Sequence, residues 1–570
     1  MENVRIAEVL DEIADLLELK RDNAFRVRSY RNAAQAVRGF TQRIEDMAEE
    51  GEDLKSIPDI GESIAKKIIE ILDTGSCRKL KMLRNQIPTG LPDLMKIPGL
   101  GPRKVKDLYD ELDISSIAEL KEACENQRIR NLEGFGEKTE KKILQGIKTI
   151  GATSGRILLK EASEFAESIA RYLKDLESID RWEVAGSFRR RKETIGDLDI
   201  LISAVDREQA GREILDYTEI EHVIGEGKEK ISVTLKAGLQ VDFRFFAERS
   251  FGAALLYFTG SRSHNIALRK IARKKGWKLN EYGMFSGEKL LAGKSEEDIY
   301  SRLGCDYIPP ELREDNDELE AARTGTLPDL IEAGDINGDF HAHTNATDGH
   351  NTIREMAVAA REQGYKYLAI TDHSKAVRIA RGLDDDRLRK HADAIRKVDA
   401  DLDNFWLLAG VEVDILKDGS LDISENVLAD LDWVCASIHS YFDLDEKKMT
   451  DRIVKVIESG VVDCIGHPLG RMLGRRDPIA VDIDAVFEAC RKNNVCLEIN
   501  AEPDRMDLPA NHARHAAATG VKLTICSDAH STSDLALMEY GVAVARRGWL
   551  TSGNVLNTLN LTDLRKELKN

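Results

Sequence analysis

The sequence lacks the features of a secreted or membrane-bound protein. It contains eight cysteines, and no two of them have the CxxC spacing of a redox or zinc motif. No apolar run reaches the roughly 18 residues that a membrane-spanning helix needs, and the N-terminus has no apolar signal-peptide core. We therefore predict a cytoplasmic protein without membrane contact, whose cysteines are reduced and mostly buried.

An overall excess of basic residues is also missing, since the formal net charge is −18. The acid is unevenly placed: residues 1–310 hold 52 Lys and Arg against 54 Asp and Glu, whereas residues 311–570 hold 31 against 47. Residues 261–278, SRSHNIALRKIARKKGWK, contain seven basic residues and no acidic one. Because local patches decide nucleic-acid binding, the first half of the chain is a candidate DNA-binding region.

Glycine turns recur in the first 150 residues, which otherwise have the pattern of helices. IPDIGESIAKKIIEIL (57–72) and IPGLGPRKVKDLYDEL (97–112) are close copies, and LEGFGEKTEKKILQGI (132–147) is a looser third. Each turn precedes a basic amphipathic helix, whose N-terminal amides can approach a phosphate closely. We predict helix-hairpin-helix DNA binding rather than a plain helical repeat. The predicted DNA-binding glycines are Gly61, Gly99, Gly101, Gly134 and Gly136.

Paired aspartates mark a mixed helix and strand region at residues 151–250. Asp197 and Asp199 lie on one predicted strand, where residues i and i+2 share a face, and Asp242 lies on a second strand-like run. Three converging carboxylates can hold two divalent cations, which removes their mutual repulsion. The alternative is a strand edge whose acids face water.

The residues just before the paired aspartates have the chemistry of a phosphate site. Gly186 and Ser187 form a turn that can meet the terminal phosphates of a nucleotide, and Arg190 would neutralise their charge. The combination of this turn with the carboxylates predicts metal-assisted nucleotide chemistry.

The second half of the chain holds ten of the twelve histidines. From about residue 336, seven short apolar runs alternate with helical patterns, which predicts a parallel, barrel-like sheet. In nearly every run a His, Asp or Glu falls at the C-terminal end, where such barrels keep their active sites. The predicted ligands are His341, His343, Asp348, His373, Glu412, His439, His467, Asp528 and His530.

These nine groups are too many for one ion, so we predict two or three. Imidazole and carboxylate ligands without thiolate suit Zn²⁺, Mn²⁺ or Fe²⁺, and such a cluster clamps a phosphate and supplies hydroxide near neutral pH. The remaining histidines of this half have no such placement and are predicted to lie at the surface: His350, His391, His512 and His515.

The motifs GSFRR, GDLDI, VDFRFF, LYFTGSRSHNIALR and YIPPELRE together resemble family X DNA polymerases over about residues 1–315. The resemblance implies that Asp197, Asp199 and Asp242 hold catalytic Mg²⁺ and that Gly186, Ser187 and Arg190 bind the triphosphate of a deoxynucleotide. It further implies a turn that packs under the sugar and contacts near the nascent base pair. The residues concerned are Tyr257, Phe258 and Gly260 for the turn, and Asn265 and Arg269 for the contacts.

The N-terminal segment resembles the lyase subdomain of the same family. Lys67, in ESIAKKI, falls where a Schiff-base lysine is expected, and such a lysine needs a lowered pKa to attack a sugar aldehyde. The sequence departs from the family at Ser63, where polymerase beta has lysine, so the pocket is less basic. Lys67 is therefore interpreted either as a lyase residue or as a DNA contact.

Residues 336–570 resemble the polymerase-and-histidinol-phosphatase (PHP) domain, a distorted seven-stranded barrel with a trinuclear metal site. In family X polymerases this domain is associated with Mn²⁺-dependent 3′→5′ exonuclease and related 3′-end or abasic-site processing. The resemblance implies the following division of the chain: lyase-like helical subdomain 1–90, helical DNA-binding subdomain 91–150, nucleotidyltransferase palm 151–250, nucleotide-selection subdomain 251–315, linker 316–335 and PHP domain 336–570.

The sequence thus predicts a multidomain, monomeric DNA repair enzyme that fills short gaps with deoxynucleoside triphosphates and trims 3′ ends. Its partners would be gapped or nicked DNA, with Mg²⁺ at the polymerase site and Mn²⁺ or Zn²⁺ in the barrel. Possible further activities are 5′-deoxyribose phosphate lyase and abasic-site endonuclease. One alternative is a phosphoesterase whose polymerase-like half only grips DNA, and another is a non-enzymatic DNA-end scaffold.

Overall fold

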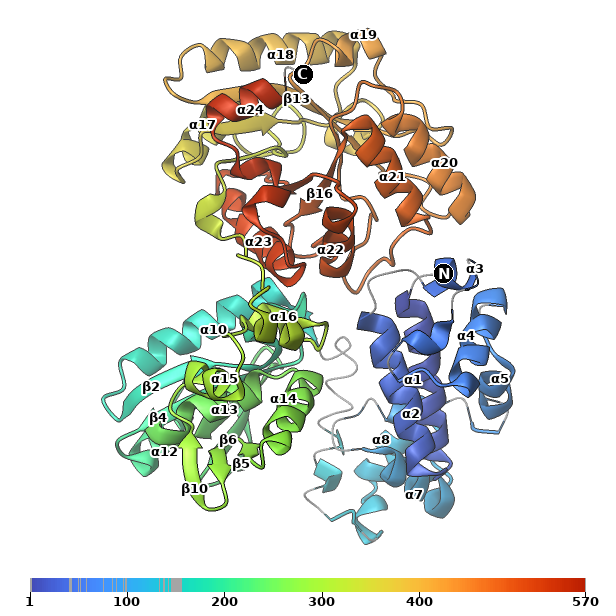
Figure 1. The fold of residues 1–570 in the computed structure, drawn as a ribbon, viewed down its shortest axis with the longest axis vertical. Helices are drawn as coiled ribbons and strands as arrows, with labels where there is room; N and C mark the ends of the chain where they lie inside the picture. The colour runs from blue at the N-terminus through green and yellow to red at the C-terminus, as the bar shows by residue number, and fades with distance from the viewer. Residues whose placement is uncertain are drawn as a thin grey trace. The chain divides into compact units, whose positions relative to one another are not determined.

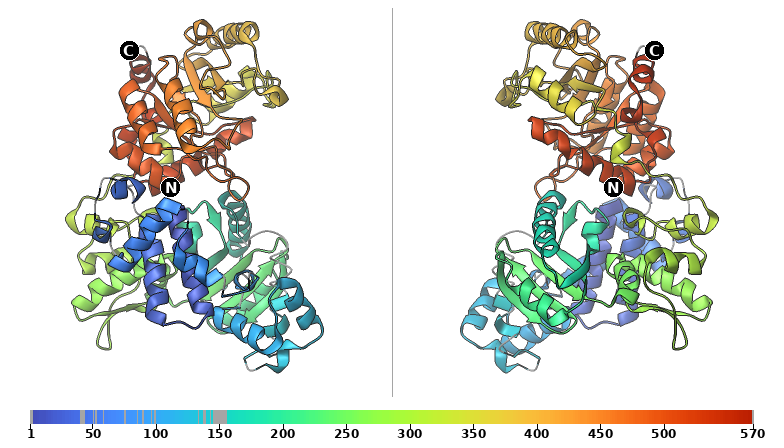
Figure 2. Two further views of the ribbon diagram at one scale, coloured as in Figure 1. Left: turned by 90° about the vertical axis from the view of Figure 1, so that its right-hand side faces the viewer. Right: turned by 90° about the vertical axis from the view of Figure 1, so that its left-hand side faces the viewer.

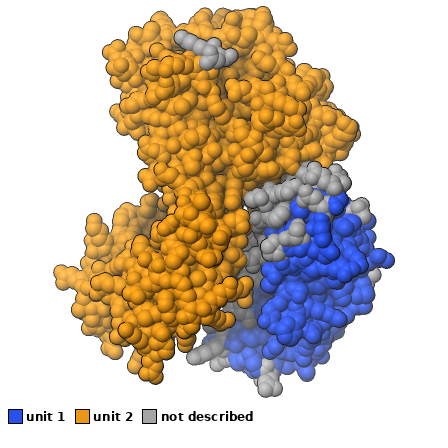
Figure 3. Space-filling model, in the orientation of Figure 1, with its two compact units in different colours: residues 1–156, 235–239 blue, residues 157–234, 240–570 orange. Residues whose placement is uncertain are grey.

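The computed structural model divides the chain into two compact units, residues 1–156 with 235–239 and residues 157–234 with 240–570 (Figures 1 and 3). Each unit is described by itself. The structure describes all residues except 1–2, 40–43, 50, 52, 58, 75, 85, 89, 96, 98–99, 133, 137–138, 142, 145–155 and 569–570. Among the described residues, none of the helices is long and apolar enough to cross a membrane.

The first unit is built from helices, as the sequence predicts for residues 1–150. Its helices are α1 (Asn3–Leu19), α2 (Ala24–Gly39), α3 (Ile44–Glu49), α4 (Glu62–Thr74), α5 (Arg78–Arg84), α6 (Leu91–Leu94), α7 (Pro102–Leu112) and α8 (Ile117–Glu125). They bury one continuous apolar core, to which α1 contributes Leu10 and Ile13 and α4 contributes Ile68. The helices of the first two glycine repeats are α4 and α7, and each follows its glycine turn directly.

The second unit begins with a five-stranded mixed sheet in the order β2-β4-β7-β6-β5. Its strands are β2 (Ile179–Val184), β4 (Asp197–Ala204), β5 (Ile220–Glu226), β6 (Lys230–Leu235) and β7 (Gln240–Phe245), with the helices α10 (Leu159–Lys174), α11 (Gly186–Arg189) and α12 (Arg207–Leu215). Four of these strands were predicted. The edge strand β5 was not, because its sequence IEHVIGE is largely exposed and lacks an apolar face.

A small subdomain follows the sheet and packs around its own core. It contains α13 (Phe251–Thr259), α14 (Arg262–Lys274), the three-stranded sheet β8 (Lys278–Asn280), β9 (Gly283–Ser286) and β10 (Lys289–Ala292), α15 (Glu296–Leu303) and α16 (Glu318–Thr324). A buried hydrogen bond fixes α16 to this core, since Nδ1 of His264 lies 2.6 Å from Oε1 of Glu318 and both side chains are fully buried. The region that the sequence marks as a connection therefore contains a packed helix.

The rest of the second unit is a barrel of seven parallel strands in sequential order, β11 to β17. The strands are β11 (Gly338–Asp339), β12 (Tyr367–Ile370), β13 (Trp406–Asp414), β14 (Trp433–Ser437), β15 (Cys464–Ile465), β16 (Cys496–Asn500) and β17 (Leu523–Cys526). All seven predicted strands are confirmed. Beyond the ends of β11 and β17, a bridge between Ala342 and Ala529 brings the first and last strands together.

Helices cover the outside of the barrel, where Figure 2 shows them in yellow to red around the strands. They are α17 (Ile353–Glu362), α18 (Asp385–Asp399), α19 (Glu425–Leu428), α20 (Glu446–Ile457), α21 (Ile483–Asn493), α22 (Ala510–Ala518), α23 (Met538–Arg547) and α24 (Leu561–Glu567). Inside the barrel, Phe340 stacks on Trp433 with 4.5 Å between the ring centroids. Buried cysteines from four strands belong to the same apolar cluster. All eight cysteines of the chain are free and buried, as predicted.

Ion pairs join the part of the second unit that precedes residue 315 to the barrel. Oε1 of Glu193 lies 3.0 Å from Nη2 of Arg471, and Oε1 of Glu311 lies 2.7 Å from Nε of Arg546. Burial alone would raise the pKa of Glu193, but the charges of Arg471 and Arg547 lower it to about 2. The glutamate is therefore ionised at neutral pH and binds the barrel electrostatically.

Candidate active sites

Strand pairing brings the predicted carboxylates of the mixed sheet together. Strands β4 and β7 run parallel, and Asp199 lies directly opposite Asp242 in the register, with Asp197 two residues earlier on β4. Asp197 is exposed to solvent, whereas Asp242 is only 2% exposed. The three acids therefore form a row that runs from solvent into the sheet, a geometry that could hold divalent cations.

The glycine turn before β4 lies close against this row of aspartates. Gly186 has φ +67°, and a Cβ added to it would lie 3.2 Å from Oδ2 of Asp199. The backbone N–H of Ala185 also donates a 2.7 Å hydrogen bond to the carbonyl oxygen of Asp199. Glycine is thus required here both by its left-handed conformation and by the nearby carboxylate.

Two cations that the sequence analysis missed neutralise the acids. Arg244 donates to Asp199 at 2.9 Å and to Asp242 at 2.7 Å, and Nζ of Lys230 lies 2.5 Å from Oδ2 of Asp242. Burial would raise the pKa of Asp242, but hydrogen bonds from Lys230 and Ser232 and the charge of Arg244 lower it. The alternation of strand residues could have identified both cations, because Arg244 lies two residues after Asp242 and Lys230 begins the neighbouring strand.

The predicted phosphate-binding arginine has protein partners in this structure. Nε of Arg190 lies 3.1 Å from Oε1 of Glu314, and its Nη1 donates to the carbonyl oxygen of Thr259 at 2.5 Å. Lys192 shares the same glutamate at 3.0 Å. Ser187 is half-buried on the same turn, where its carbonyl oxygen accepts from the N–H of Lys192 at 3.1 Å.

The predicted sugar-side turn lies beside the carboxylates. The guanidinium of Arg244 sits 4.4 Å from the ring centroid of Phe258, which packs edge-on against Tyr257 at 5.1 Å. Gly260 ends α13 with φ +68°. The structure therefore brings the turn and the acidic row together through one arginine.

The predicted base-pair contacts lie on α14 and are engaged locally. The side-chain amide of Asn265 donates to the carbonyl oxygen of Tyr257 at 2.6 Å, and Nε of Arg269 donates to the carbonyl oxygen of Asn265 at 3.2 Å. The Asn265 hydrogen bond joins α14 to the end of α13, whereas that of Arg269 lies within α14.

Lys67 lies on α4 of the first unit, close to Ser63 and Tyr30. Its Nζ donates to Oγ of Ser63 at 2.9 Å and to the carbonyl oxygen of the same residue at 2.8 Å, and it lies 5.8 Å from the ring centroid of Tyr30. Burial lowers the pKa of Lys67 below its ordinary value. A lowered pKa is what an amine nucleophile requires.

The hairpin glycines divide into two kinds. Gly61, Gly101 and Gly136 have ordinary φ values, and a Cβ added to any of them would meet no atom of the described residues within 4 Å. Gly134 has φ +82°, so the backbone itself favours glycine there. The fold does not require glycine at the first three positions, which leaves room for close approach of a ligand. Gly99 lies outside the described residues.

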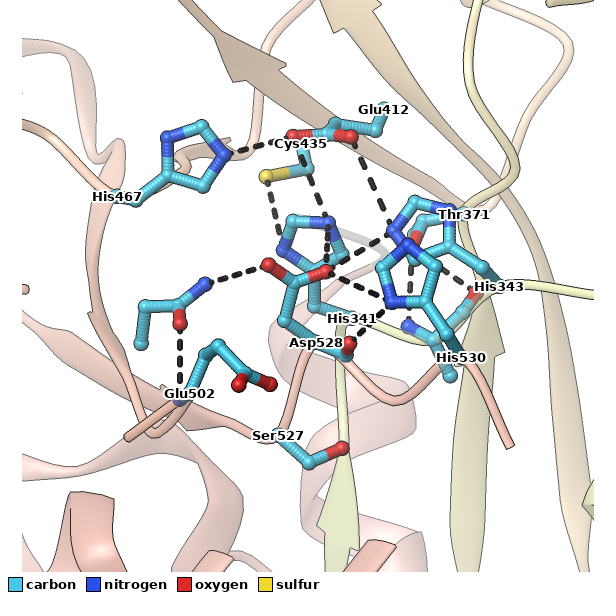
Figure 4. A network of polar contacts seen from close by, with 12 residues as sticks. His341, His343, Thr371, Glu412, Cys435, His467, Glu502, Ser527, Asp528 and His530 are labelled. Carbon is cyan, nitrogen blue, oxygen red and sulfur yellow. Dashed lines mark hydrogen bonds and ion pairs between the residues drawn. The ribbon is translucent and has the colours of Figure 1, made fainter. Parts of the chain in front are cut away.

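The predicted ligands of the barrel converge on one place at the C-terminal ends of the strands. Figure 4 shows six of them: His341, His343, Glu412, His467, Asp528 and His530. Three groups of side chains have ligand atoms within 4.8 Å of one another: His343, Asp348, His373 and His530; His341, His343 and Asp528; and His373, Glu412 and His439. His343 and His373 each belong to two groups. Sharing of this kind is expected where neighbouring ions have bridging or adjacent ligands.

Glu412 lies at the centre of the cluster. Its Oε1 lies 3.0 Å from Nε2 of His467 and 3.2 Å from Nε2 of His439, and its Oε2 lies 2.7 Å from Nδ1 of His373. The side chain is 1% exposed. Glu412 therefore connects His467, which belongs to none of the three groups, to the rest of the site.

The cluster passes a chemical test for metal binding. Buried polar side-chain atoms normally have hydrogen-bond partners, yet several atoms here have none in the described structure. They are Nε2 of His341, Nδ1 of His343, Oδ1 of Asp348 and Nδ1 of His467. A set of unpartnered lone pairs on imidazole and carboxylate groups is what divalent transition metals bind.

Two further carboxylates orient the histidines and were missed from the sequence. Oε1 of Glu498 on β16 lies 2.6 Å from Nδ1 of His341, and Oδ1 of Asp414 on β13 lies 3.0 Å from Nδ1 of His439. Both leave Nε2 of the imidazole facing the cluster, which is the usual arrangement around ligating histidines. Asp414 ends the apolar strand β13, and Glu498 is the acid within the apolar strand β16, a signal that could have identified them.

Neighbouring groups shift the pKa values of the histidines in opposite directions. Burial lowers the pKa of His343, and the neighbouring His530 and His373 lower it further, to about 4. Burial also opposes the charge on His439, but Glu412 and Asp414 raise its pKa to about 9. In this state the carboxylates are balanced by protonated histidines.

One prediction about the remaining histidines is wrong. His391 was expected at the surface, but it is buried, and its Nε2 lies 2.8 Å from Oδ2 of Asp372. The helix pattern of residues 385–399 did not show that this face of α18 covers the barrel. His350 is exposed, whereas His512 and His515 are half-buried.

Models of five known families match successive parts of the chain, and these parts correspond to the regions described above. Residues 1–77 match a helix-hairpin-helix domain and residues 91–149 a SAM-like helix-hairpin-helix tandem. Residues 156–246 match the DNA polymerase beta palm and residues 254–314 the DNA polymerase beta thumb. Residues 339–502 match the PHP domain.

Three curated proteins illustrate the similarity. DNA polymerase/3′-5′ exonuclease PolX of Bacillus subtilis (strain 168) is 40% identical over 568 residues, which cover 99% of each chain. DNA polymerase lambda of Rattus norvegicus is 26% identical over 345 residues, 55% of this chain and 56% of that protein. A probable phosphatase of Thermoanaerobacter sp. (strain X514) is 31% identical over 233 residues, 39% of this chain and 89% of that protein.

Proposed function

The chain belongs to the bacterial PolX family of family X DNA polymerases, and on this basis we propose that it fills short gaps in DNA and trims 3′ ends. The observation that carries the proposal is the presence of two separate groups of side chains whose chemistry and spacing suit divalent metal ions. One is the row of Asp197, Asp199 and Asp242. The other is the histidine cluster at the barrel mouth.

For nucleotide addition, the three aspartates would hold Mg²⁺, which neutralises phosphate charge and lowers the pKa of the primer hydroxyl. Gly186, where a Cβ would lie 3.2 Å from Oδ2 of Asp199, would let the triphosphate approach the acids closely. Arg190 would bind the phosphates by exchanging Glu314 for them, and Phe258 and Tyr257 would pack against the sugar. Asn265 and Arg269, on α14, would contact the nascent base pair.

For 3′-end trimming, the nine barrel ligands would hold two or three ions, of which Mn²⁺ suits the imidazole-rich set and Zn²⁺ is the alternative. Such ions supply hydroxide and neutralise the charge of the scissile phosphate. Glu498 and Asp414 position His341 and His439 for this task. Removal of a 3′ phosphate or cleavage at an abasic site would use the same residues.

In the first unit, Gly61, Gly101, Gly134 and Gly136, with Gly99, would approach the DNA backbone. The depressed pKa of Lys67 supports a second role, as a nucleophile toward a 5′-deoxyribose phosphate. We propose that the protein acts as a cytoplasmic monomer on gapped or nicked DNA, with deoxynucleoside triphosphates as substrates.

A paired assay tests the proposal. Purified protein is incubated with a one-nucleotide gap, with and without deoxynucleotides, and its metal content is measured by mass spectrometry. Extension with nucleotides, loss of 3′ nucleotides without them, and at least two bound transition-metal ions per chain are expected. A protein that degrades 3′ ends but never extends would be a phosphoesterase with a DNA-gripping half, an outcome compatible with the similarity to a probable phosphatase.

A further inference from the structure

A short loop at the mouth of the barrel is unusually well anchored. It spans residues 374–383, directly after the predicted ligand His373. At its base the N–H of Ser374 donates to the carbonyl oxygen of Glu412 at 3.0 Å, and the N–H of Leu383 donates to that of His373 at 2.8 Å. A Cβ on Gly382 would lie 1.9 Å from the carbonyl oxygen of Ser374, so the two ends of the loop are in close contact.

The far side of the loop is fixed to a second ligand segment. The guanidinium of Arg381 donates to the carbonyl oxygen of Thr347, one residue before the predicted ligand Asp348. Nη1 of Arg387, on α18, donates to the carbonyl oxygens of Arg381 and Gly382, each at 3.0 Å. The loop is therefore held at its base by the backbone of the predicted ligands His373 and Glu412, and at its side by Thr347 and by Arg387 of α18.

The tip of this loop carries an exposed apolar side chain. Ile379 is 96% exposed, although the next residue, Ala380, is 2% exposed. Single exposed aliphatic residues are common on protein surfaces and need no explanation by themselves. Ile379 differs because the loop that presents it is anchored to the histidine cluster.

The charge around Ile379 is also distinctive. Lys375, Arg378 and Arg381 are exposed in the same loop, and residues 374–383 contain no acid. Three aspartates follow at 384–386, and Nζ of Lys375 lies 3.5 Å from Oδ1 of Asp385, so among the described residues the cations without an acidic partner at the tip are the arginines. The surrounding second half of the chain is strongly acidic, with 47 Asp and Glu against 31 Lys and Arg. The guanidinium of Arg378 makes no hydrogen bond or ion pair with any residue that the structure describes. A cationic loop with an apolar tip fits a nucleic-acid strand, whose phosphates and bases it can contact together.

We propose that Ile379 is a wedge that separates the terminal base pair of a DNA 3′ end, while Arg378 holds the adjacent phosphate. Apolar side chains, isoleucine among them, insert between base steps and unstack them in other DNA-binding proteins. A metal cluster that cleaves one strand needs that strand to leave its partner, and the rigid loop supplies the separation. The inference rests on the proposed 3′-end trimming by the barrel.

The wedge is tested with the full-length protein and three substrates: a duplex with a paired 3′ end, the same strand unpaired, and bis(p-nitrophenyl) phosphate, which has no base. Ile379→Ser should slow removal of the paired 3′ nucleotide by about 10-fold, because unstacking is no longer assisted. It should change the other two rates less than about 2-fold, and Ile379→Phe should retain the wild-type rate on the paired end. Val358→Ser, at an exposed aliphatic position of α17 in the same domain, is the control.

A binding measurement separates this inference from the proposed function. A duplex with 2-aminopurine as the paired 3′-terminal base should fluoresce more strongly when wild-type protein binds, and less so with Ile379→Ser. If the wild-type protein hydrolyses none of the substrates, trimming is wrong, yet an Ile379-dependent fluorescence change would preserve the wedge. Equal slowing on paired and unpaired strands, or no change in either rate or fluorescence, overturns it.

Arg378→Ala gives a second readout. Loss of one phosphate contact should weaken DNA binding and reduce the slope of log affinity against log salt concentration by about one. If Arg378→Ala kept the wild-type salt slope, the proposed contact between Arg378 and a DNA phosphate would be wrong.

Discussion

The mixed sheet and the barrel solve the same electrostatic problem in different ways. Both gather carboxylates that would repel one another. In the sheet, Arg244 and Lys230 occupy the carboxylate oxygens directly. In the barrel, Glu412 and its neighbouring acids are balanced by histidines, which lose their charge when they bind a metal.

The difference has a consequence for metal exchange. A cation that enters the sheet must compete with two permanent positive charges, so its binding should depend on the triphosphate that arrives with it. The barrel offers buried unpartnered lone pairs, so its ions should be resident. We expect the polymerase site to exchange metal with each nucleotide and the barrel to keep its metal through purification.

The largest expected effect separates the two sites completely. Replacing both Asp197 and Asp199 by Ala should reduce nucleotide addition by at least ~10³-fold, because metal stabilisation of the phosphates is lost. Exonuclease activity and metal content should stay near wild type. Loss of both activities in a folded protein would contradict the separation.

The reciprocal change should be nearly as large. His341 and His343 share one face of the chain after β11, so replacing both with Ala should remove at least one ion and lower exonuclease activity by ~10³-fold. Primer extension should be unchanged. Mass spectrometry of the bound metal and the two activity assays would check this. If the double variant kept the wild-type exonuclease rate, the barrel would be a scaffold and not the site of the exonuclease.

An intermediate effect tests the role of Arg244 as a competitor of the metal. Arg244→Met keeps most of the packing against Phe258 but removes the charge. Hydrogen bonds to charged groups contribute roughly 1.5–3 kcal/mol, so half-maximal extension should need about 10-fold less Mg²⁺. Arg212→Ala, an exposed arginine of α12, is the control. An unchanged Mg²⁺ requirement would show that Arg244 does not restrain the acids.

A smaller effect concerns the first unit, where Gly101 is the N-cap residue of α7 with φ −81° and ψ 168°. Serine is a good N-cap residue, so Gly101→Ser should leave Tm unchanged or slightly higher. Affinity for gapped DNA should nevertheless fall by ~3-fold or more, because the added side chain occupies space near a phosphate. Gly225→Ala, in β5, is the control. Unchanged affinity would make this turn an ordinary helix connection.

The smallest expected effect concerns the ion pair between Glu193 and Arg471, which joins the region of the mixed sheet to the barrel. The pKa of Glu193 is lowered from 4.5 to about 2 by Arg471 and Arg547 in the folded protein. Its contribution to stability is therefore complete above about pH 4.5 and is lost as the pH falls toward 2. Glu193→Gln should lower Tm by a few degrees at pH 7, with a difference that shrinks below pH 4. Glu183→Gln, which is 43% exposed, should show no such pH dependence.

The sequence by itself determined the elements and the chemistry of each site. The seven apolar runs predicted the barrel strands because a parallel strand covered on both faces must be apolar throughout. Ligands at the strand ends followed from the same topology, since parallel C-terminal ends meet at one rim. Asp197 and Asp199 could be placed on one face because strand alternation fixes which residues share a face, and Asp242 stood out as an acid within an apolar, strand-like run.

Only the tertiary structure decided which charges meet across strands and helices. Arg244 and Lys230, Glu498 and Asp414, and the burial of His391 depend on register, packing and which helix face covers the barrel. The same holds for Ile379: its sequence neighbours are those of any polar loop, and only the closure of that loop onto His373 places it at the barrel mouth. Local periodicity specifies an element and its faces, but contacts between distant residues arise from the packing of those elements.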